Sequence, residues 1–153
     1  IQTTNKIVTA FFVNNGFNPG KKVYTVRIPD YIRNSPDIQV KRGFVRGLFD
    51  TDGCIYFDKN RTPFHYYPRL EFAFASENLT ADLDILLKDL NFKPHTWKDR
   101  ESYHLAMAGF LQLDNFIRHV SPANHKHIKR IEIGLANKTK VDLKKKSINL
   151  KSD

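Results

Sequence analysis

The sequence predicts a small α+β domain in which helices cover one face of an antiparallel sheet. From Pro36 onward, segments whose apolar residues recur at helical spacing alternate with pairs of short segments that read as strands. The resulting order is α-β-β-α-β-β-α-α, which is typical of helices laid against a single sheet. A chain of 153 residues is also long enough for one domain with its own core. We therefore expect one main domain over 35–153, preceded by an N-terminal extension over 1–34.

The first helix of this domain is expected over 36–50. Ser35 can accept a hydrogen bond from a free backbone N–H, and Pro36 suits the first helical position, where its missing donor is harmless. Gly53 predicts the end of the helix, because glycine accepts the left-handed backbone with which many helices end.

An antiparallel strand pair is expected next, over 54–60 and 66–75. In the second strand, polar or small residues alternate with apolar ones, so that one face is wet and the other is buried. The connection between the strands contains Asn60, Arg61 and Pro63, and both asparagine and proline favour turns.

The second half of the domain repeats this order. Leucines at helical spacing predict a core-facing helix over 79–90, with Asn78 or Thr80 as its cap. A later helix must end before Pro122, because proline disfavours a helical conformation in the residue before it. The expected elements are a strand pair over 95–100 and 102–108, a helix over about 110–120 and a basic helix over 124–138.

The N-terminal extension echoes a later part of the chain. Segment 14–19 followed by 23–26 reads as a helix end, a tight turn, a proline and a strand, and so does 89–94 followed by 102–105. We expect the extension to be a partial repeat of the later helix and strand pair, without a motif helix of its own. A chance match between two helix-to-strand connections is the alternative.

The chain carries a formal net charge of +9, from 25 Lys and Arg against 16 Asp and Glu. An excess of this size favours a polyanionic partner, although a solvated basic surface also explains it. Nine of the Lys and Arg lie within 126–151, where Glu132 and Asp142 are the only acidic residues. Such a run is more often a solvated face than a specific site, but it supports nucleic-acid binding.

Cys54 is the only cysteine, which excludes an intrachain disulfide framework and the thiolate set of a zinc finger. We therefore expect an intracellular, cytoplasmic protein. No apolar run approaches the roughly 18 residues of a membrane span, and segment 1–15 lacks the features of a signal peptide. We expect no membrane partner.

The acidic sequence Asp50-Thr51-Asp52-Gly53 stands where the first helix ends. Exposed carbonyls at a helix end carry partial negative charge, so two carboxylates at this place favour a bound cation. Oxygen ligands suit Mg²⁺, which keeps several waters and shares its coordination with a phosphate. An isolated pattern of this kind more often only shapes a turn. A calcium-binding loop is excluded, because Cys54 stands where that loop needs Asp or Asn.

Gly43 and Gly47 lie four residues apart on one face of the same helix. Glycine inside a helix costs about 1 kcal/mol relative to alanine, so its presence needs a reason. Close packing against a second helix is one such reason, and simple tolerance is the alternative.

The segment 45–53 resembles the signature Leu-Ala-Gly-Leu-Ile-Asp-Ala-Asp-Gly of the LAGLIDADG homing endonucleases. Val45 and Phe49 are apolar replacements, whereas Arg46 and Thr51 depart from the signature. The identical positions are Gly47, Leu48, Asp50, Asp52 and Gly53. The resemblance covers 35–138 and implies the family fold, a saddle-like antiparallel sheet in the order αββαββα with helices on one face.

This resemblance implies an intron-encoded endonuclease that hydrolyses both strands of a DNA site with a divalent metal. Asp52 corresponds to the family's catalytic, metal-binding aspartate, and the carbonyl of Thr51 is expected to be a further ligand. The expected ion is Mg²⁺, with Mn²⁺ or Ca²⁺ able to replace it for binding. Lys126, or else Lys129, corresponds to the family's lysine that polarises water, while Asp50 is expected to order the helix end.

A family member with one motif is expected to act as a homodimer. The resemblance places Gly43 and Gly47 at the contact between the two motif helices, where the two Asp52 side chains meet. Arg46 belongs to the same interface, and it is the position that fits a close contact least well.

The resemblance also implies that the sheet lies in the major groove of a long, pseudo-palindromic site in double-stranded DNA. Counting alternate residues from Asp52 places Tyr56, Asp58 and Asn60 on the side expected to contact DNA. Further expected contacts are Arg61 in the connection and Tyr67, Arg69 and Glu71 in the second strand, with Lys98, Arg100 and His104 of the later pair as weaker candidates.

Two other functions fit the same fold. One is a DNA-binding regulator that does not cut, and the other is a maturase that assists RNA splicing. The retained Asp52 favours cleavage over the first. Neither Ser76 nor Glu77 matches the glutamine that some family members carry after the second strand, so neither receives a role.

Overall fold

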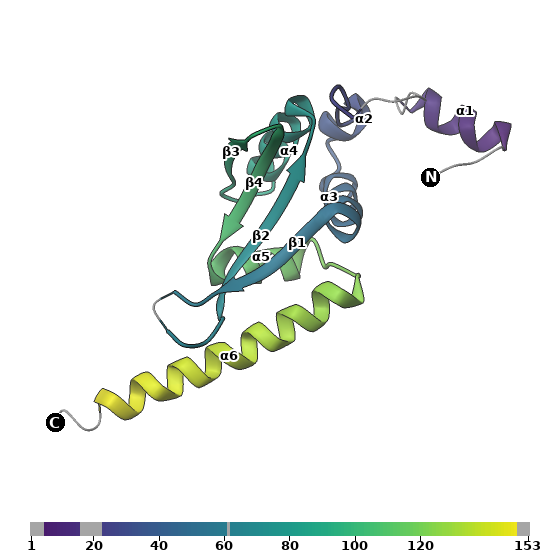
Figure 1. Cartoon of the computed structure of the whole chain (residues 1–153). Coiled ribbons are helices and arrows are strands. Elements are labelled where there is room, and N and C mark those ends of the chain that lie inside the picture. The colour runs from purple at the N-terminus through teal and green to yellow at the C-terminus, as the bar shows by residue number, and fades with distance from the viewer. Residues whose placement is uncertain (1–4, 16–22, 61, 150–153) are drawn as a thin grey trace.

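The computed structural model describes residues 5–15, 23–60 and 62–149, and it confirms the α+β class (Figure 1). The described elements form one four-stranded sheet of order β1-β2-β4-β3, in which all neighbouring strands are antiparallel. In chain order the elements are α1 (Lys6–Asn14), α2 (Asp30–Arg33), α3 (Ile38–Asp52), β1 (Gly53–Asp58), β2 (Tyr67–Phe74), α4 (Glu77–Asp89), β3 (His95–Asp99), β4 (Ser102–Ala108), α5 (Phe110–His119) and α6 (His125–Asn149).

The register of β2 decides which side chains enter the core. Leu70 pairs with Ile55 of β1 and Met107 of β4, and Phe72 pairs with Leu105. All five side chains are at most 1% exposed, and they form one core cluster with apolar residues of α3, α4 and α5. The residues between them along each strand point to the opposite face of the sheet. We call this second side the open face.

Two helix caps differ from the predicted ones. Helix α3 begins at Ile38, and its cap is Asp37, whose Oδ1 accepts from the N–H of Gln39 at 2.8 Å. Ser35 instead accepts from the N–H of Asp37 at 3.2 Å, so it shapes the turn before the helix. Helix α4 is capped by Ser76 rather than by Asn78 or Thr80, because the Ser76 hydroxyl accepts from the N–H of Leu79 at 3.3 Å.

Gly53 follows α3 as predicted, but the reason given for it was wrong. Its φ of −78° and ψ of 160° are extended values that any residue adopts. A Cβ at this position would lie 2.7 Å from the carbonyl oxygen of Phe49 and would also meet the Phe49 ring. Glycine is therefore required for the close approach of β1 to the end of α3.

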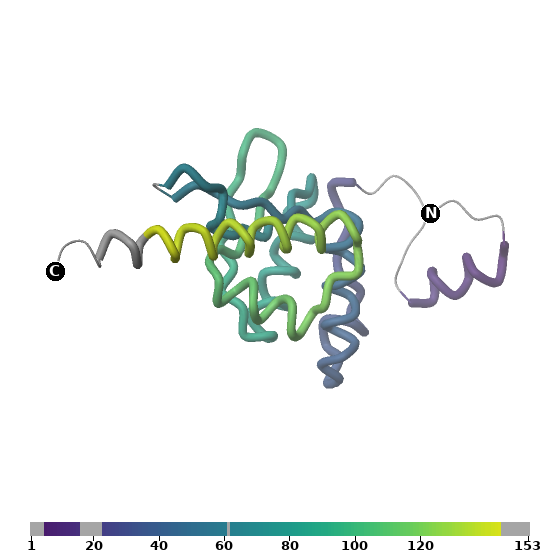
Figure 2. The backbone as a smooth tube through the Cα atoms, turned by 90° about the horizontal axis from the view of Figure 1, so that it is seen from below, coloured from purple at the N-terminus to yellow at the C-terminus, as the bar shows by residue number. Residues whose placement is uncertain are grey.

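Helix α6 is longer than predicted and crosses the molecule beside β1 (Figures 1 and 2). His127 anchors its first turn: the side chain is 4% exposed and lies against Phe49, with Nε2 donating to the Phe49 carbonyl at 3.2 Å. Among the described residues, Nδ1 of His127 has no hydrogen-bond partner. Burial lowers the pKa of His127, and the hydrogen bond to Phe49 only partly opposes this effect.

The N-terminal extension contains α1, but the strand expected over 23–26 is not formed, because residues 23–25 make a turn. Part of the proposed repeat, 16–22, lies outside the described residues. The stretch that follows is fixed to α4 by Asp82, which is 2% exposed. Its carboxylate accepts two hydrogen bonds from Arg27, one from Arg33 at 3.1 Å and one from the N–H of Ile28 at 3.2 Å. None of the described helices is long and apolar enough to cross a membrane.

Candidate metal centre and nucleic-acid interface

Asp50 ties the end of α3 to the segment that starts α6. Its carboxylate accepts from the N–H of Ala123 at 3.0 and 3.1 Å and from the N–H of Asn124 at 3.0 Å. The side-chain amide of Asn124 donates in return to the Asp50 carbonyl at 2.7 Å. Asn124 also accepts from the N–H of Lys126 at 3.0 Å. These bonds hold the first turn of α6, with the exposed side chain of Lys126, beside the acidic motif.

Asp52 differs from Asp50 because its carboxylate is exposed and is not used by the main chain. Its Oδ2 lies 3.0 Å from the hydroxyl of Thr51, which is also within 3.1 Å of the Gly47 carbonyl and 3.2 Å of the Leu48 carbonyl. The carbonyl of Thr51 belongs to the last turn of α3, where carbonyls have no partner within the helix. One carboxylate and one carbonyl are therefore open to a cation here.

A divalent cation fits these donors only in part. Among the described residues of one chain, no group of three His, Cys, Asp or Glu comes together to hold a metal. Mg²⁺ accepts one or two carboxylates when waters and a phosphate supply its remaining oxygens. Asp52 and Thr51 of a single chain thus provide part of such a coordination shell.

The helix face that carries Gly43 and Gly47 is open. Within 5–15, 23–60 and 62–149, no atom outside the adjoining turns of α3 lies within 4 Å of a Cβ built at either glycine. The opposite face is fully buried, with Val45 and Phe49 at 0% exposure. Arg46 is exposed at the flank of the glycine face. The geometry therefore leaves room for another backbone to approach α3 next to Asp52.

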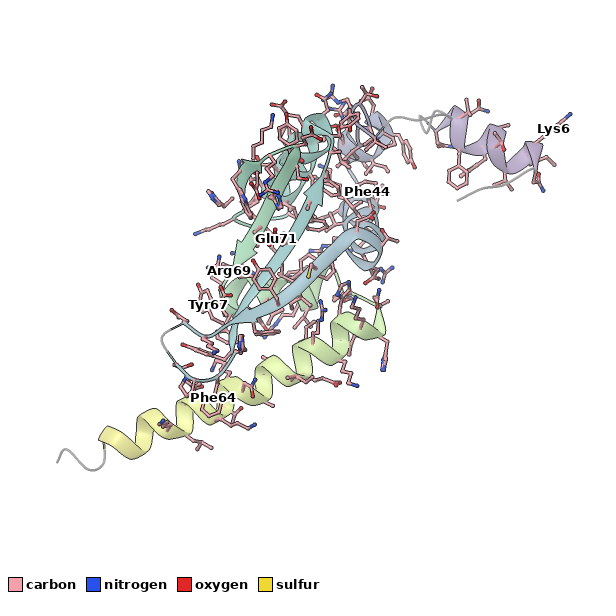
Figure 3. The ribbon with its side chains drawn as sticks, in the orientation of Figure 1. Lys6, Phe44, Phe64, Tyr67, Arg69 and Glu71 are labelled. Carbon is pink, nitrogen blue, oxygen red and sulfur yellow. The ribbon has the colours of Figure 1, made fainter. Side chains whose placement is uncertain are left out.

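Glu71 is the centre of a polar cluster on the open face, in the inner strand β2 (Figure 3). Its Oε2 accepts from the hydroxyl of Tyr56 at 2.8 Å, and its Oε1 lies 2.9 Å from Nδ1 of His104. Partial burial and the hydrogen bond to Glu71 raise the pKa of Tyr56 to about 12, so the hydroxyl stays a donor at neutral pH. The cluster presents one phenol and one imidazole, both held by the same carboxylate.

The ion pair of Arg69 with Asp58, and Tyr67 beyond it, lie next to this cluster on the open face. Along β2, Arg69 forms an ion pair with Asp58, and each side chain is 41% exposed. Figure 3 shows Tyr67, Arg69 and Glu71 following one another along the strand. Six predicted contact residues therefore share one face of the sheet: Tyr56, Asp58, Tyr67, Arg69, Glu71 and His104.

The prediction for Lys98 was wrong. Lys98 pairs with Tyr103, so it points to the helix side, where its Nζ lies 4.8 Å above the Tyr103 ring. Trp97 takes the place next to His104 on the open face, with ring centroids 5.0 Å apart and planes 13° from parallel. His95 stacks on the other side of Trp97 at 5.6 Å.

His95 and Trp97 were missed because the prediction gave Lys98 of β3 and His104 of β4 the same face of the sheet. The hairpin turn at Arg100 sets Asp99 opposite Ser102, so Trp97 and not Lys98 pairs with His104. Arg100 and Asn60 themselves lie in turns outside the strands, with φ of 53° and 43°. Arg61 lies outside the described residues.

Comparison with known families agrees with this geometry. A family model described as a LAGLIDADG-like domain matches residues 39–121, which is more than half of the chain and reaches from α3 to the end of α5. No curated protein matches the sequence. Proteins of this family bind DNA, as homing endonucleases or as maturases. With its acidic motif at the end of α3 and its open four-stranded sheet, the chain belongs to the LAGLIDADG homing endonuclease family.

Proposed function

We propose that this protein is a site-specific endonuclease that cuts both strands of DNA with a divalent metal. The observation that carries the proposal is the contrast between the two motif aspartates. Asp50 is committed to backbone N–H groups, whereas Asp52 presents an exposed carboxylate beside an open helix face. A carboxylate that only ended the helix would have no reason to stand free at the negative end of the helix dipole.

The active unit in this proposal is a homodimer. Gly43 and Gly47 would allow two α3 helices to pack closely about a twofold axis, since no described residue of the chain occupies that space. Each copy would then bring one Asp52 to the centre, which completes the ligand set that one chain lacks. A symmetric dimer would recognise a long and pseudo-palindromic DNA site.

The chain's own residues would divide the chemistry between them. Mg²⁺, when bound, supplies a Lewis acid that activates water and stabilises the leaving oxygen, and Mn²⁺ or Ca²⁺ would replace it for binding. Asp52 and the Thr51 carbonyl would hold the ion, and Asp50 would position α6. Lys126, at the start of α6, would orient the water network with its ammonium group.

The open face would supply sequence recognition in the major groove. Arg69, Asp58 and Tyr67 offer charged and hydroxyl groups to base edges near the outer end of β2, and the Glu71 cluster lies closer to Asp52 along the same strand. Trp97, in the edge strand β3, adds an aromatic side chain to the same face. Asn60 and Arg100 lie in turns beyond the strands, where polar and basic side chains suit phosphates, and Arg61 stays an expected DNA contact.

The decisive experiment selects cleaved sites from a randomised duplex library in Mg²⁺ and compares three proteins on the selected site. Asp52→Asn should abolish cleavage and leave DNA binding intact. Asp114→Asn, the same chemical change on the outer surface of α5, should cut like the wild type. Cleavage by Asp52→Asn at the wild-type rate would overturn the mechanism. A wild-type protein that binds one site tightly but leaves it intact in Mg²⁺ and Mn²⁺ would be a regulator instead.

A further inference from the structure

Several basic residues of helix α6 lie on one side of the helix. When residues are placed every 100° around the helix axis, five basic residues fall within an arc of about 100°. The acidic residues of this helix, Glu132 and Asp142, fall outside that arc. We call the five residues the cationic stripe: Lys126, Lys129, Arg130, Lys140 and Lys144.

The rest of α6 explains why the stripe faces outward. His127, Ile131 and Val141 are at most 7% exposed and hold the helix against the body. Gly134 is part of the same contact, since a Cβ there would collide with the Phe57 ring. Lys138 lies on this inner side, paired with Asp142 at 2.7 Å. The inward face is thus fixed by packing, and the stripe lies at its edge.

Three lysines of the stripe are not neutralised within the part of the chain that the structure describes. Lys126, Lys129 and Lys140 are exposed and form no ion pair with a carboxylate there. Arg130 uses one nitrogen to donate to the Ile55 carbonyl at 3.2 Å and leaves its other donors for a further acceptor. Such a row of like charges lowers the stability of a helix unless an anion offsets it.

Arg130 of the stripe meets the open face of the sheet along β1. A groove there is lined by Cys54 and Tyr56 from the strand and by Arg130 and Asn137 from α6. Figure 2 shows α6 running across the width of the body. From Lys126 to Lys144 the stripe is about 27 Å long, at 1.5 Å per residue. This length approaches one turn of B-DNA, about 34 Å.

We propose that the cationic stripe binds the phosphate backbone of double-stranded DNA that lies on the open face. It would be a second, sequence-independent DNA surface next to the base-reading one. Lysines on a long stem suit this task, because they contact phosphates as point charges without a fixed geometry. The inference extends the proposed function and depends on DNA binding, but not on cleavage.

The test removes two charges at the far end of the stripe, away from the acidic motif. The full chain with Lys140→Gln and Lys144→Gln is compared with the control Lys88→Gln and Lys93→Gln, which removes the same charge from exposed positions on α4 and after it. Lysine and glutamine have similar helix propensities, and circular dichroism checks that α6 is retained. Affinity for a duplex of arbitrary sequence is measured by fluorescence anisotropy over a series of salt concentrations, without Mg²⁺.

The stripe variant should reduce the slope of log K against log salt by about 1.8, since each phosphate contact contributes about 0.9. A fourfold rise in salt would then weaken its binding roughly tenfold less than that of the wild type. The control should keep the wild-type slope. Equal changes in both variants would overturn the inference, because they would reflect net charge alone.

Competition experiments have one further contrary outcome, in which a structured RNA displaces the labelled duplex from the wild type at a lower concentration than unlabelled duplex does, and displaces it less well from the stripe variant. This result would also overturn the inference, because it would identify the stripe as an RNA-binding surface. These outcomes are independent of cleavage. A protein that cuts DNA with an unchanged stripe slope contradicts only this inference. A protein that shows the slope change but never cuts contradicts only the proposed function.

Discussion

Asp50→Ala should destabilise the protein, although Asp52→Asn, two residues away in the same motif, should not. The alanine variant leaves the N–H groups of Ala123 and Asn124 without the carboxylate that accepts from them. A hydrogen bond to a charged acceptor contributes about 1.5–3 kcal/mol. Because Ala123 is exposed, we expect values near the lower end, about 2 kcal/mol in total.

Asp52 accepts only from the hydroxyl of Thr51, so its amide variant should stay within about 0.5 kcal/mol of the wild type. Urea denaturation measures both free energies of unfolding, and thermal unfolding should show Asp50→Ala about 4–8 °C below the wild type. An Asp50→Ala protein as stable as the wild type would refute the assigned role of Asp50. So would an Asp52→Asn protein that loses as much stability as Asp50→Ala.

Three further predictions concern the dimer and the pH dependence of stability. Gly47→Leu should leave the folded monomer stable, because a side chain at this position meets no described residue of its own chain. The same side chain should block the approach of a second α3 helix, so the protein should sediment as a monomer. Desolvation raises the pKa of Asp82, but the interactions of its carboxylate with Arg27, Arg33 and Ile28 have the larger effect, so the pKa is lowered overall. The folded protein should therefore lose stability as the pH falls below about 4. Asp82→Asn should remove this acid-dependent loss in denaturation curves and cost about 2 kcal/mol at neutral pH, since Arg27 is half exposed. Burial lowers the pKa of His127 in the folded protein. As the pH falls from about 6.5 toward that lowered pKa, only the unfolded chain takes up a proton at this residue, so the wild type should become less stable. His127→Met should flatten this part of the curve.

The fold could be predicted because its signals are local. Alternation in β2 and leucines at helical spacing in α4 depend only on neighbouring residues, and the buried faces follow them. The caps were harder, because several residues near each helix start can accept a hydrogen bond. Ser35 and Asp37 compete at the start of α3, and only the backbone conformation decides between them.

The parts of the site that were not predicted depend on contacts between distant residues. Asp50 binds the backbone of Ala123 and Asn124, and no local pattern relates these positions. The same holds for Asp82, whose partners Arg27 and Arg33 precede the motif helix. Lys98 was assigned to the wrong face because the alternation depends on the exact length of a turn.

The carboxylate of Glu71 has consequences for how DNA specificity could change. Both of its oxygens are occupied by side chains from two different strands, so Glu71 sets the direction in which Tyr56 and His104 point. A substitution of Glu71 alone releases two donors at once, and a substitution of either donor frees one carboxylate oxygen. Under the proposed function, recognition of a new base at this position would therefore require compatible changes at three residues, which neither a single mutation nor a one-position library provides.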